Sequence, residues 1–489
     1  MTSVDQEFLK RVSRIPYHGL GLSVDVYTPD LFELVDALER NGLDCGYLEI
    51  FKAAPAALEA VRRRLPASLL AYHAEGLWVT QPDPARCSPF HAELDETAEQ
   101  LGILGSHWLN HECASKQMGG YSFGTYLPAL FTEASAEVTA ANIALVQQRL
   151  DRDGRDEMGP LFLLETPPLT YVGFGDLGLA DYFRLVTERT PCGVVLDIGH
   201  LWTVYRYTGA WKRRSLTAFL VDLLDAFPLE RVVEIHMAGL APHECVQAGA
   251  RAAGEPPFWI DAHGAPIPEV LSDVLAQVLE HQGLAHLKGV ALEVDTKPIP
   301  MIVAEFAQAH ARFGVQCARF EVGGLRQEVQ PRTSNLKPRT SQEPPTSNVQ
   351  PPTPSLELAR HYARYAQIVT GQATTGLPVL GQDASALALY VEQYLPQEIL
   401  EWGGAVREMF PETCRSLEQA GVPLDEFVRF WLREPRETDQ AYDFFLLKIA
   451  RFIEFIREVL PDSLDTAERE AQALRDGYRA ACEVVTSDR

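Results

Sequence analysis

The stretch Leu161-Phe-Leu-Leu-Glu165 and, further along, Gly193-Val-Val-Leu-Asp197 decide the fold of this chain. Each is a short run of aliphatic residues that ends in a carboxylate. The runs Val232-Val-Glu-Ile-His236 and Gly289-Val-Ala-Leu-Glu293 have the same form and end in an imidazole and another carboxylate. Strands of a buried parallel sheet have this nearly continuous apolar character, and in a parallel barrel their ends bring side chains to one rim. The pattern therefore predicts a parallel barrel whose rim binds metal.

Residues 17–325 alternate such strand-like runs with amphipathic helical stretches, as repeated βα units do. Strand-like runs near residues 20, 47, 70, 109, 163, 195, 234 and 291 give a count of eight. Eight βα units in about 300 residues fit a (β/α)8 TIM-like barrel. A doubly wound sheet is the structural alternative, but it would not readily bring acidic and histidine side chains together from so many strands. We therefore predict an α/β barrel over residues 1–325.

A second domain is predicted after the barrel, because 489 residues exceed what one hydrophobic core usually supports. Residues 326–356 are rich in Pro, Ser and Thr and have few apolar side chains, which is typical of a disordered linker. From residue 357 to residue 489 the pattern is helical, without strand alternation. We therefore expect a separate all-α C-terminal domain.

Composition and charge exclude several classes of function. The formal net charge of −24 and the pI near 5.0 argue against nucleic acid as the main partner, because its phosphates would be repelled. The N-terminus lacks the features of a signal peptide, and no apolar run approaches the ~20 residues that span a membrane. The eight cysteines are scattered without a Cys-x-x-Cys pair, which excludes a disulfide scaffold and a zinc ribbon. The expected location is a reducing, cytoplasmic one.

The candidate metal ligands are acidic and histidine residues at the ends of the predicted strands and in the cluster around Asp261. They are His73, His111, Glu165, Asp197, His200, His236, Asp261, His263 and Glu293. Asp261 and His263 are two apart, so an extended segment projects both to one side, and Glu234 shares a face with His236 in the same way. Each has another explanation by itself, since a lone histidine is often structural and Asp197 could cap the next helix. Together, imidazole and carboxylate ligands suit iron, manganese or zinc.

The same residues support a resemblance to a known family. Residues 17–325 resemble the multinuclear non-heme iron-dependent oxidative enzymes, whose best-known member makes methanobactin. The resemblance rests on the order and spacing of short motifs: His73-x-x-Gly76-Leu77, His111, Gly119-Gly120, Leu127-Pro128, Leu164-Glu165-x-Pro167, Leu196-Asp197, Glu234-Ile-His236-x-Ala-Gly239, Asp261-x-His263-Gly264 and Glu293-x-Asp295. Each motif is weak alone, but together and in register they identify the chain as similar to this family.

The resemblance implies a barrel that holds two or three non-heme iron ions and uses O2 as co-substrate. It also implies a substrate, which is a cysteine-containing segment of a ribosomally synthesised precursor peptide whose thiolate binds iron. In relatives, a partner protein often captures the leader of this peptide. The chain departs from the family at several places: Thr166 and His200 stand where the family usually has Asn, and Phe51 stands near Glu49 where His is expected. These departures bear on the number of irons, the substrate and the product.

The resulting prediction is an O2-dependent iron oxidase of peptide natural-product (RiPP) biosynthesis, with three alternatives left open. A divalent-metal sugar isomerase or epimerase would use the same barrel with fewer histidines. A metal-dependent endonuclease needs a basic face, which a net charge of −24 opposes. A non-catalytic module that binds peptide or metal would show no turnover. The helical domain likewise has two open roles, either holding the precursor peptide near the rim or acting as a dimerisation or stabilising module.

Overall fold

The computed structural model describes residues 2–82, 84, 88–153, 158–169, 174–242, 257, 259–323, 356–373, 390–436 and 443–486. The predicted linker, residues 326–356, lies outside the described residues except for Leu356, where a helix begins. The disorder of this linker, and the domain limits that depend on it, therefore stay predictions.

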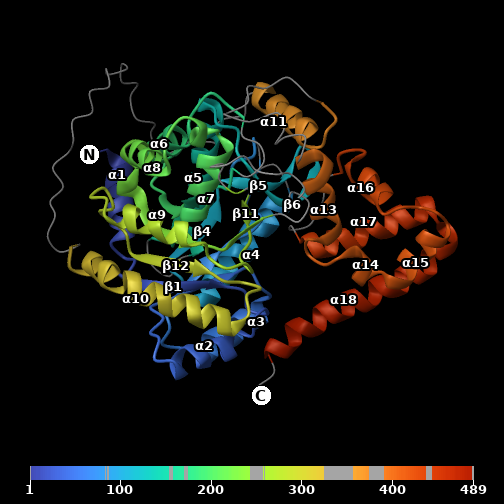
Figure 1. Cartoon of the computed structure of the whole chain (residues 1–489), viewed down its shortest axis with the longest axis horizontal. Helices are drawn as coiled ribbons and strands as arrows, with labels where there is room; N and C mark the ends of the chain where they lie inside the picture. Colours follow the sequence, from blue (N-terminus) through green and yellow to red (C-terminus); the bar gives the residue numbers. More distant parts are fainter. Residues whose placement is uncertain are drawn as a thin grey trace.

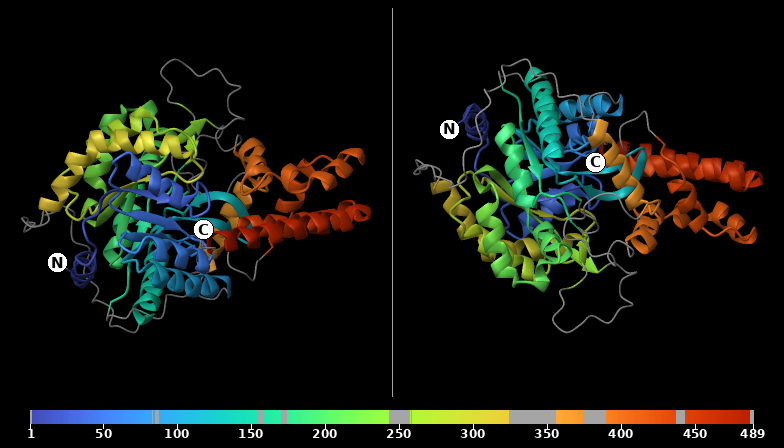
Figure 2. Two further views of the ribbon diagram at one scale, coloured as in Figure 1. Left: turned by 90° about the horizontal axis from the view of Figure 1, so that it is seen from below. Right: turned by 90° about the horizontal axis from the view of Figure 1, so that it is seen from above.

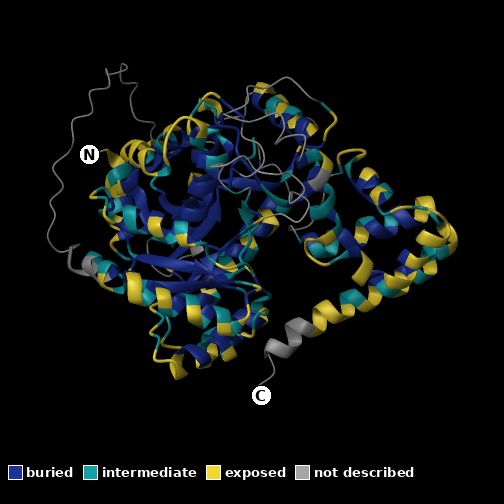
Figure 3. Ribbon diagram, viewed as in Figure 1, coloured by how far each residue is buried: buried dark blue, intermediate teal, exposed yellow. Residues whose placement is uncertain are grey.

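Eight parallel strands close into a barrel, as the sequence predicted (Figure 1). The strands are β1 (Gly19–Val24), β2 (Leu48–Phe51), β3 (Leu70–His73), β4 (Trp108–Glu112), β7 (Leu161–Glu165), β8 (Gly193–Asp197), β9 (Val232–Met237) and β12 (Gly289–Glu293). They lie around the barrel in chain order, and β12 pairs with β1 to close it. Nearly every residue of these strands is buried, which explains the aliphatic runs in the sequence (Figure 3).

Helices cover the outside of the barrel (Figure 1). They are α1 (Ser3–Val12), α2 (Leu31–Arg40), α3 (Pro55–Arg64), α4 (Ser88–Leu104), α5 (Glu133–Asp153), α6 (Leu179–Arg189), α7 (Ile198–Tyr207), α8 (Leu216–Ala226), α9 (Glu269–Leu279) and α10 (Ile299–Gly323), with short 3-10 turns η2 (Ala210–Lys212) and η3 (Leu229–Arg231). Helix α2 illustrates how the sequence determines where a helix begins and which face it buries. Asp30 accepts hydrogen bonds from the backbone N–H groups of Phe32 and Glu33, both 3.0 Å long, and so caps the first turn. Leu34 and Leu38 then form its buried face.

Side chains from the N-terminal ends of the strands fill the interior of the barrel. His18, just before β1, stacks on Trp108 at the start of β4, with ring centroids 4.7 Å apart. The Trp108 indole N–H donates a 2.8 Å hydrogen bond to Glu234 in the middle of β9, and the Tyr47 hydroxyl donates to the same carboxylate. This end is therefore closed, and the carboxyl ends of the strands are left as the place for a site.

Two β-hairpins follow barrel strands at this carboxyl-terminal rim. They consist of β5 (Ala114–Met118) with β6 (Tyr121–Pro128), after β4, and of β10 (Leu240–Pro242) with β11 (Trp259–Asp261), after β9. Gly119 and Gly120 connect β5 to β6 with φ values of +59° and +82°. A two-residue turn with positive φ at both positions favours glycine, which explains the Gly-Gly pair. Because β4 and β9 run in the same direction, both hairpins stand at one end of the barrel.

The C-terminal region is helical throughout the described ranges 356–373, 390–436 and 443–486, as predicted. Its elements are α11 (Leu356–Val369), a π-helical turn (Tyr390–Tyr394), α13 (Leu395–Glu401), α14 (Val406–Met409), α15 (Pro411–Gln419), α16 (Asp425–Leu432), α17 (Phe444–Val459), the 3-10 turn η6 (Pro461–Ser463) and α18 (Leu464–Thr486). Figure 2 shows these orange and red helices projecting from one side of the barrel. Within the part of the chain that is described, no helix is long and apolar enough to cross a membrane.

The hydrophobic core of the helical region continues into hairpin β5–β6. Phe427 of α16 is fully buried and packs against Phe452 of α17, with ring centroids 5.2 Å apart. The same apolar cluster includes Phe123 of β6. The Trp431 indole N–H also donates a 2.9 Å hydrogen bond to the Ser122 carbonyl of that strand. The hairpin therefore follows a barrel strand in sequence but packs with the C-terminal helices.

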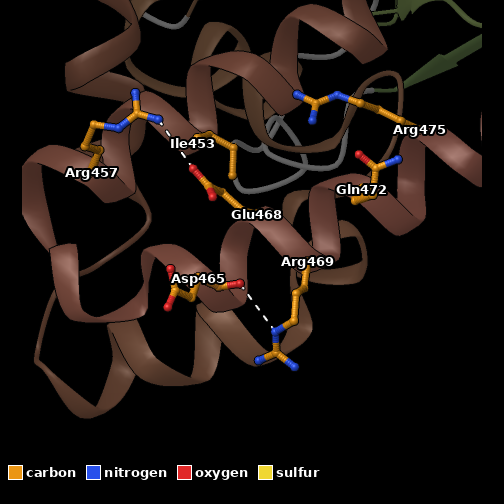
Figure 4. Close-up of a pocket in the computed structure, with 7 residues that line it drawn as sticks. All are labelled: Ile453, Arg457, Asp465, Glu468, Arg469, Gln472 and Arg475. Atoms are coloured by element: carbon orange, nitrogen blue, oxygen red, sulfur yellow. Dashed lines mark hydrogen bonds and ion pairs between the residues drawn. The ribbon is translucent and has the colours of Figure 1, made fainter.

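A surface groove lies between α17 and α18 (Figure 4). It is lined by Ile453, Arg457, Asp465, Glu468, Arg469, Gln472 and Arg475. Arg457 pairs with Glu468 at 3.6 Å, and both side chains are more than half exposed. Water screens such an exposed pair, so it contributes little to stability. The groove is thus open and of mixed charge.

Candidate metal centre

The carboxyl ends of the barrel strands bring most of the predicted ligands to one rim. His73, Glu165, Asp197 and Glu293 are the last residues of β3, β7, β8 and β12, and His236 lies opposite Asp197 in the β8–β9 register. All five side chains belong to residues that are at most 2% exposed. Residues far apart in the chain therefore converge in one buried place.

Six of the predicted ligands alternate carboxylate and imidazole around a closed ring. In order they are Glu165, His236, Glu293, His263, Asp261 and His200. His236 Nδ1 lies 3.5 Å from Glu165 Oε2 and 3.3 Å from Glu293 Oε1. His263 Nε2 lies 3.5 Å from Glu293 Oε2 and 3.1 Å from Asp261 Oδ2. These are four of the six contacts of the ring.

His200 closes the ring, and two further predicted ligands join it. Its Nε2 lies 3.6 Å from Asp261 Oδ2, and its Nδ1 lies 3.8 Å from Glu165 Oε1. His73 Nε2 lies 3.6 Å from Glu165 Oε2, and Asp197 Oδ1 lies 3.7 Å from His200 Nδ1. The ring with these two residues forms one connected network in which Glu165 contacts three imidazoles.

Asp197 is both a helix cap and a member of the network. Its Oδ1 accepts a 2.6 Å hydrogen bond from the backbone N–H of His200 and so caps α7, which is the structural role open to a lone aspartate after a strand. Its Oδ2 is buried and has no hydrogen-bond partner among the described residues. Capping therefore uses one oxygen and leaves the other available to a metal.

His111 lies outside the network. Its Nδ1 lies 2.8 Å from the Glu112 carbonyl oxygen, and its Nε2 accepts a 3.2 Å hydrogen bond from the backbone N–H of Leu77, which assigns the proton to Nδ1. Burial lowers the pKa of His111 to about 4, so the ring is neutral. Among the described residues, the groups that could hold a metal ion include neither His111 nor Asp261 and His263. Both ring nitrogens of His111 contact the backbone, and its role as a metal ligand stays a prediction.

Hairpin β10–β11 positions Asp261 at the rim. Leu240 and Asp261 are paired in this hairpin. A Cβ atom on Gly239 would lie 2.0 Å from the Ala265 carbonyl oxygen, so only glycine lets the two segments approach this closely. His263 follows the end of the hairpin by two residues and contacts both Asp261 and Glu293 of the ring. The strand pairing that places Asp261 therefore also places His263 nearby.

Four acidic residues that were not among the predicted ligands also contact the network. They are Glu49, Glu112, Glu234 and Asp295. His236 Nε2 lies 3.4 Å from Glu49 Oε1 and 3.8 Å from Glu234 Oε1. Asp295 pairs with His263 Nδ1, which orients that ring. Glu49 is the second residue of β2 rather than its last, so the strand-end rule used for the other residues does not identify it.

The polar atoms of the network fit a metal. Five groups of three residues each place one ligand atom per residue within 4.8 Å of the others. Both ring nitrogens of His236, and Nε2 of His200, are buried without a hydrogen-bond partner among the residues that the structure describes. Buried polar atoms rarely stay unpaired, and imidazole with carboxylate is a donor set that iron, manganese and zinc accept. This set of side chains could therefore hold a metal ion.

Without metal, the network holds protons tightly. Burial raises the pKa of Glu49 to about 8, and the neighbouring Glu234 carboxylate adds to the shift. Burial alone would lower the pKa of His73, but Glu112 and Glu165 raise it to about 10. Both groups therefore keep their protons in the fold at pH values where the unfolded chain releases them.

We expect the metal-free protein to lose stability as the pH rises. The pKa of His73 is 6.5 in the unfolded chain and about 10 in the fold. The stability that His73 contributes is therefore fully present below pH 6.5 and is lost as the pH rises through about 10. The pKa of Glu49 rises from 4.5 in the unfolded chain to about 8 in the fold, so its contribution to stability is likewise lost as the pH rises through about 8. Thermal unfolding in the presence of a chelator should therefore give a lower Tm at about pH 9 than at about pH 6.5. The variant His73→Gln should show a smaller fall, and a Tm that stays constant or rises in both proteins contradicts the expectation.

Two solved structures align with about three fifths of this chain at low identity. Endonuclease IV from Thermus thermophilus aligns with a TM-score of 0.36 and 16% identity, over 62% of this chain and 99% of the other. A D-psicose 3-epimerase aligns with a TM-score of 0.33 and 12% identity, over 63% of this chain and 100% of the other. Values this low carry no argument about function, and the barrel rests on the strand order of the chain itself.

Sequence comparison is more specific. A UPF0276 protein of Caulobacter vibrioides is 28% identical over 272 residues, which cover 55% of this chain and 85% of that relative. A UPF0276 protein of Vibrio parahaemolyticus is 23% identical over 299 residues, covering 60% of this chain and 91% of the relative. The family model of the RiPP precursor modification enzymes MbnB/TglH/ChrH matches residues 46–313, a range that includes the whole network. This chain belongs to the MbnB/TglH/ChrH family of RiPP precursor modification enzymes.

Proposed function

We propose that this protein is a multinuclear non-heme iron oxidase that uses O2 to modify a cysteine-containing segment of a ribosomal precursor peptide. Membership of the family supports the peptide substrate. The proposal rests on one observation above all, the closed ring of alternating carboxylates and imidazoles. Carboxylates are hard anionic ligands that stabilise ferric iron, while neutral imidazoles bind ferrous iron and leave it accessible to O2.

The proposed ligands are the predicted residues that the structure brings together. They are His73, Glu165, Asp197, His200, His236, Asp261, His263 and Glu293. Glu165 belongs to three of the five groups that could hold an ion, so it is the residue that adjacent metal positions would share. His111 holds the backbone near Leu77 and supports the centre from outside.

The residues of the chain would bind the ions, orient the substrate and limit the access of water. The chemistry supplied by bound iron would be O2 activation and removal of electrons from the substrate. Asp261 and His263 are the more accessible members of the ring, with side chains 23% and 22% exposed, so the peptide would approach from their side. On the opposite side, Trp108 and Glu234 close the interior of the barrel. Among the described residues, the side of the ring next to hairpin β10–β11 is therefore the proposed route of approach.

Elemental analysis of protein purified without oxygen tests this proposal. More than one iron per chain supports it, and a single zinc or manganese per chain contradicts it. Iron-loaded protein should then be mixed with O2 and with the cysteine-bearing peptides encoded in short neighbouring reading frames. A mass change confined to one of these peptides supports the oxidase. Iron-loaded protein that leaves all of them unchanged supports the non-catalytic alternative instead.

We expect His263→Ala to lose iron and activity without unfolding the chain. Its Nε2 lies 3.1 Å from Asp261 and 3.5 Å from Glu293, so the substitution opens the ring on its accessible side. The affinity for at least one ion should fall about tenfold or more. Iron per chain after anaerobic reconstitution, with circular dichroism, measures both effects. His281→Ala is the control, because His281 pairs with the exposed Asp225 at 3.4 Å outside the network and should keep full iron content. Full iron content in His263→Ala would remove His263 from the ligands.

Two further sequence predictions belong to this proposal. We propose that the helical region contributes to binding of the precursor peptide, and the groove between α17 and α18 is a described surface on which this can be tested (Figure 4). A reducing cytoplasm would keep the substrate thiol free. The cysteines that the structure describes, at positions 45, 113, 192, 317 and 414, are free thiols, in agreement with such a compartment.

A further inference from the structure

Phe51 places an apolar side chain against two imidazoles of the network. It is the last residue of β2 and lies opposite His73 in the β2–β3 register. The centroid of its phenyl ring is 4.7 Å from that of the His73 ring and 6.4 Å from that of the His263 ring. Phe51 is partly exposed, whereas His73 is 1% exposed. Phe51 therefore covers the buried imidazole and borders the more accessible one.

The backbone of β2 fixes the direction of this phenyl ring. Residues two apart on a strand project to the same face, so Phe51 shares a face with Glu49. Glu49 is fully buried, and its Oε1 lies 3.4 Å from His236 Nε2. The Lys52 backbone N–H donates a 3.1 Å hydrogen bond to the His73 carbonyl oxygen, so the pairing with β3 continues past Phe51. Phe51 is thus held between the buried Glu49 and the rim of the barrel.

Polar side chains accompany Phe51 on the accessible side of the network. Asp261, His263 and Asp295 have side chains that are 23%, 22% and 21% exposed. Sites for small groups usually combine a few polar side chains with apolar and aromatic walls. Contacts between sulfur and an aromatic ring are also favourable. A partly exposed phenyl ring beside these residues therefore suits a thiol with apolar surroundings.

We infer that Phe51 is a specificity-determining residue, which contacts the substrate cysteine and an apolar group next to its sulfur. Phe51 has no ligand atom, so it acts by packing and by excluding water from the imidazole face that it covers. It favours thiols with an apolar substituent over thiols with a polar one. The inference rests on the proposed function, which supplies the thiol substrate, and adds a substrate preference that carboxylates and imidazoles alone do not provide.

Binding of two small thiols to the full-length protein loaded with Co2+ tests this inference. Propanethiol and mercaptoethanol have nearly the same size, and a hydroxyl in the second replaces the terminal methyl of the first. Titration followed by the thiolate-to-cobalt absorption band gives the affinity for each thiol. We expect wild-type protein to prefer propanethiol, and the ratio of the two affinities to fall about three- to tenfold in Phe51→Ala.

Phe32→Ala is the matched control. Phe32 of α2 is also partly exposed and packs against a polar group, because the Arg64 guanidinium lies 3.4 Å from the centre of its ring. It takes no part in the network, so this variant should keep the wild-type ratio. The number of Co2+ ions per chain, and their absorption without thiol, show whether each variant keeps the metal centre. A changed ratio at unchanged Co2+ content therefore reports on thiol selection and not on folding.

Phe51→Leu and Phe51→Asn provide a second comparison that holds even if Phe51→Ala does not fold. The two new side chains have nearly the same shape, and one is apolar while the other is polar. The preference for propanethiol should be larger in Phe51→Leu than in Phe51→Asn.

The inference is overturned if the ratio is the same in wild-type protein, Phe51→Ala and Phe51→Asn. It is also overturned if wild-type protein gives no thiolate band or does not prefer propanethiol. Failure of the proposed oxidase function gives a different result. The preference for propanethiol would then be present and depend on Phe51, yet the iron-loaded protein would leave every peptide unchanged.

Discussion

In Glu165→Gln, at least one iron ion per chain is lost and peptide oxidation falls about 100-fold or more. Glu165 is 1% exposed and lies 3.6, 3.8 and 3.5 Å from nitrogen atoms of His73, His200 and His236. No other residue takes part in as many of the metal-binding groups found among the described residues. A neutral amide has nearly the same volume, but it offers a weaker oxygen ligand and no charge to balance ferric iron. Iron content after anaerobic reconstitution measures the loss.

Glu93→Gln is the matched control for this variant. Glu93 is also 1% exposed, but its carboxylate pairs with Lys52 at 2.7 Å and takes no part in the ring. We expect this variant to keep its full iron content, because the same chemical change is made in an equally buried place outside the centre. Equal iron content in the two variants would show that Glu165 does not bind metal.

Phe427→Ala should destabilise the helical region by about 3–5 kcal/mol, because it removes a fully buried ring and leaves a cavity. The Phe427 ring packs against Phe452, Phe455 and Trp431, at centroid distances of 5.2, 5.5 and 5.8 Å. The urea midpoint of the transition that reports on the C-terminal helices measures the change. Since the hairpin β5–β6 shares this core, the hairpin should lose packing contacts under conditions where these helices unfold.

Val459→Ala provides the comparison at the surface. Val459 ends α17 and is 37% exposed, so its truncation removes little buried area. The expected change in the free energy of unfolding is within about 0.5 kcal/mol. A loss in Phe427→Ala as small as that in Val459→Ala would contradict the assignment of Phe427 to the core.

The barrel could be predicted because each of its strands is encoded locally. A run such as Leu161–Glu165 is buried on both faces, so its sequence alone shows what it is. The hairpin β5–β6 could not be found in this way. Its first strand, Ala114–Met118, reads Ala-Ser-Lys-Gln-Met, with no aliphatic run. The apolar surface that covers the hairpin comes from helices more than 200 residues further along the chain, such as α13 (Leu395–Glu401).

The part of the candidate metal centre that lies at the ends of parallel strands could be predicted, because the common direction of the strands brings their last residues to one rim. Ligands at strand ends, such as Glu165 and Glu293, needed only the parallel arrangement to meet. His111 follows the same rule, and what separates it from the network is a backbone N–H of Leu77, contributed by the segment after β3. Glu112 is the last residue of β4, so the strand-end rule would have included it beside His111, and its partners lie on β3 and β7. Membership of the family favours modification of a precursor peptide over the sugar isomerase and endonuclease alternatives.

The short hairpin β10–β11 has a consequence for how this enzyme family can diversify. Leu240 pairs with Asp261 and Pro242 pairs with Trp259, so the position of Asp261 is set by strand pairing on both sides of the intervening chain. A change in the number of residues between the two paired segments therefore leaves the register of Asp261 unchanged. Relatives that differ in the length of this connection can thus still present the same carboxylate at the rim of the barrel.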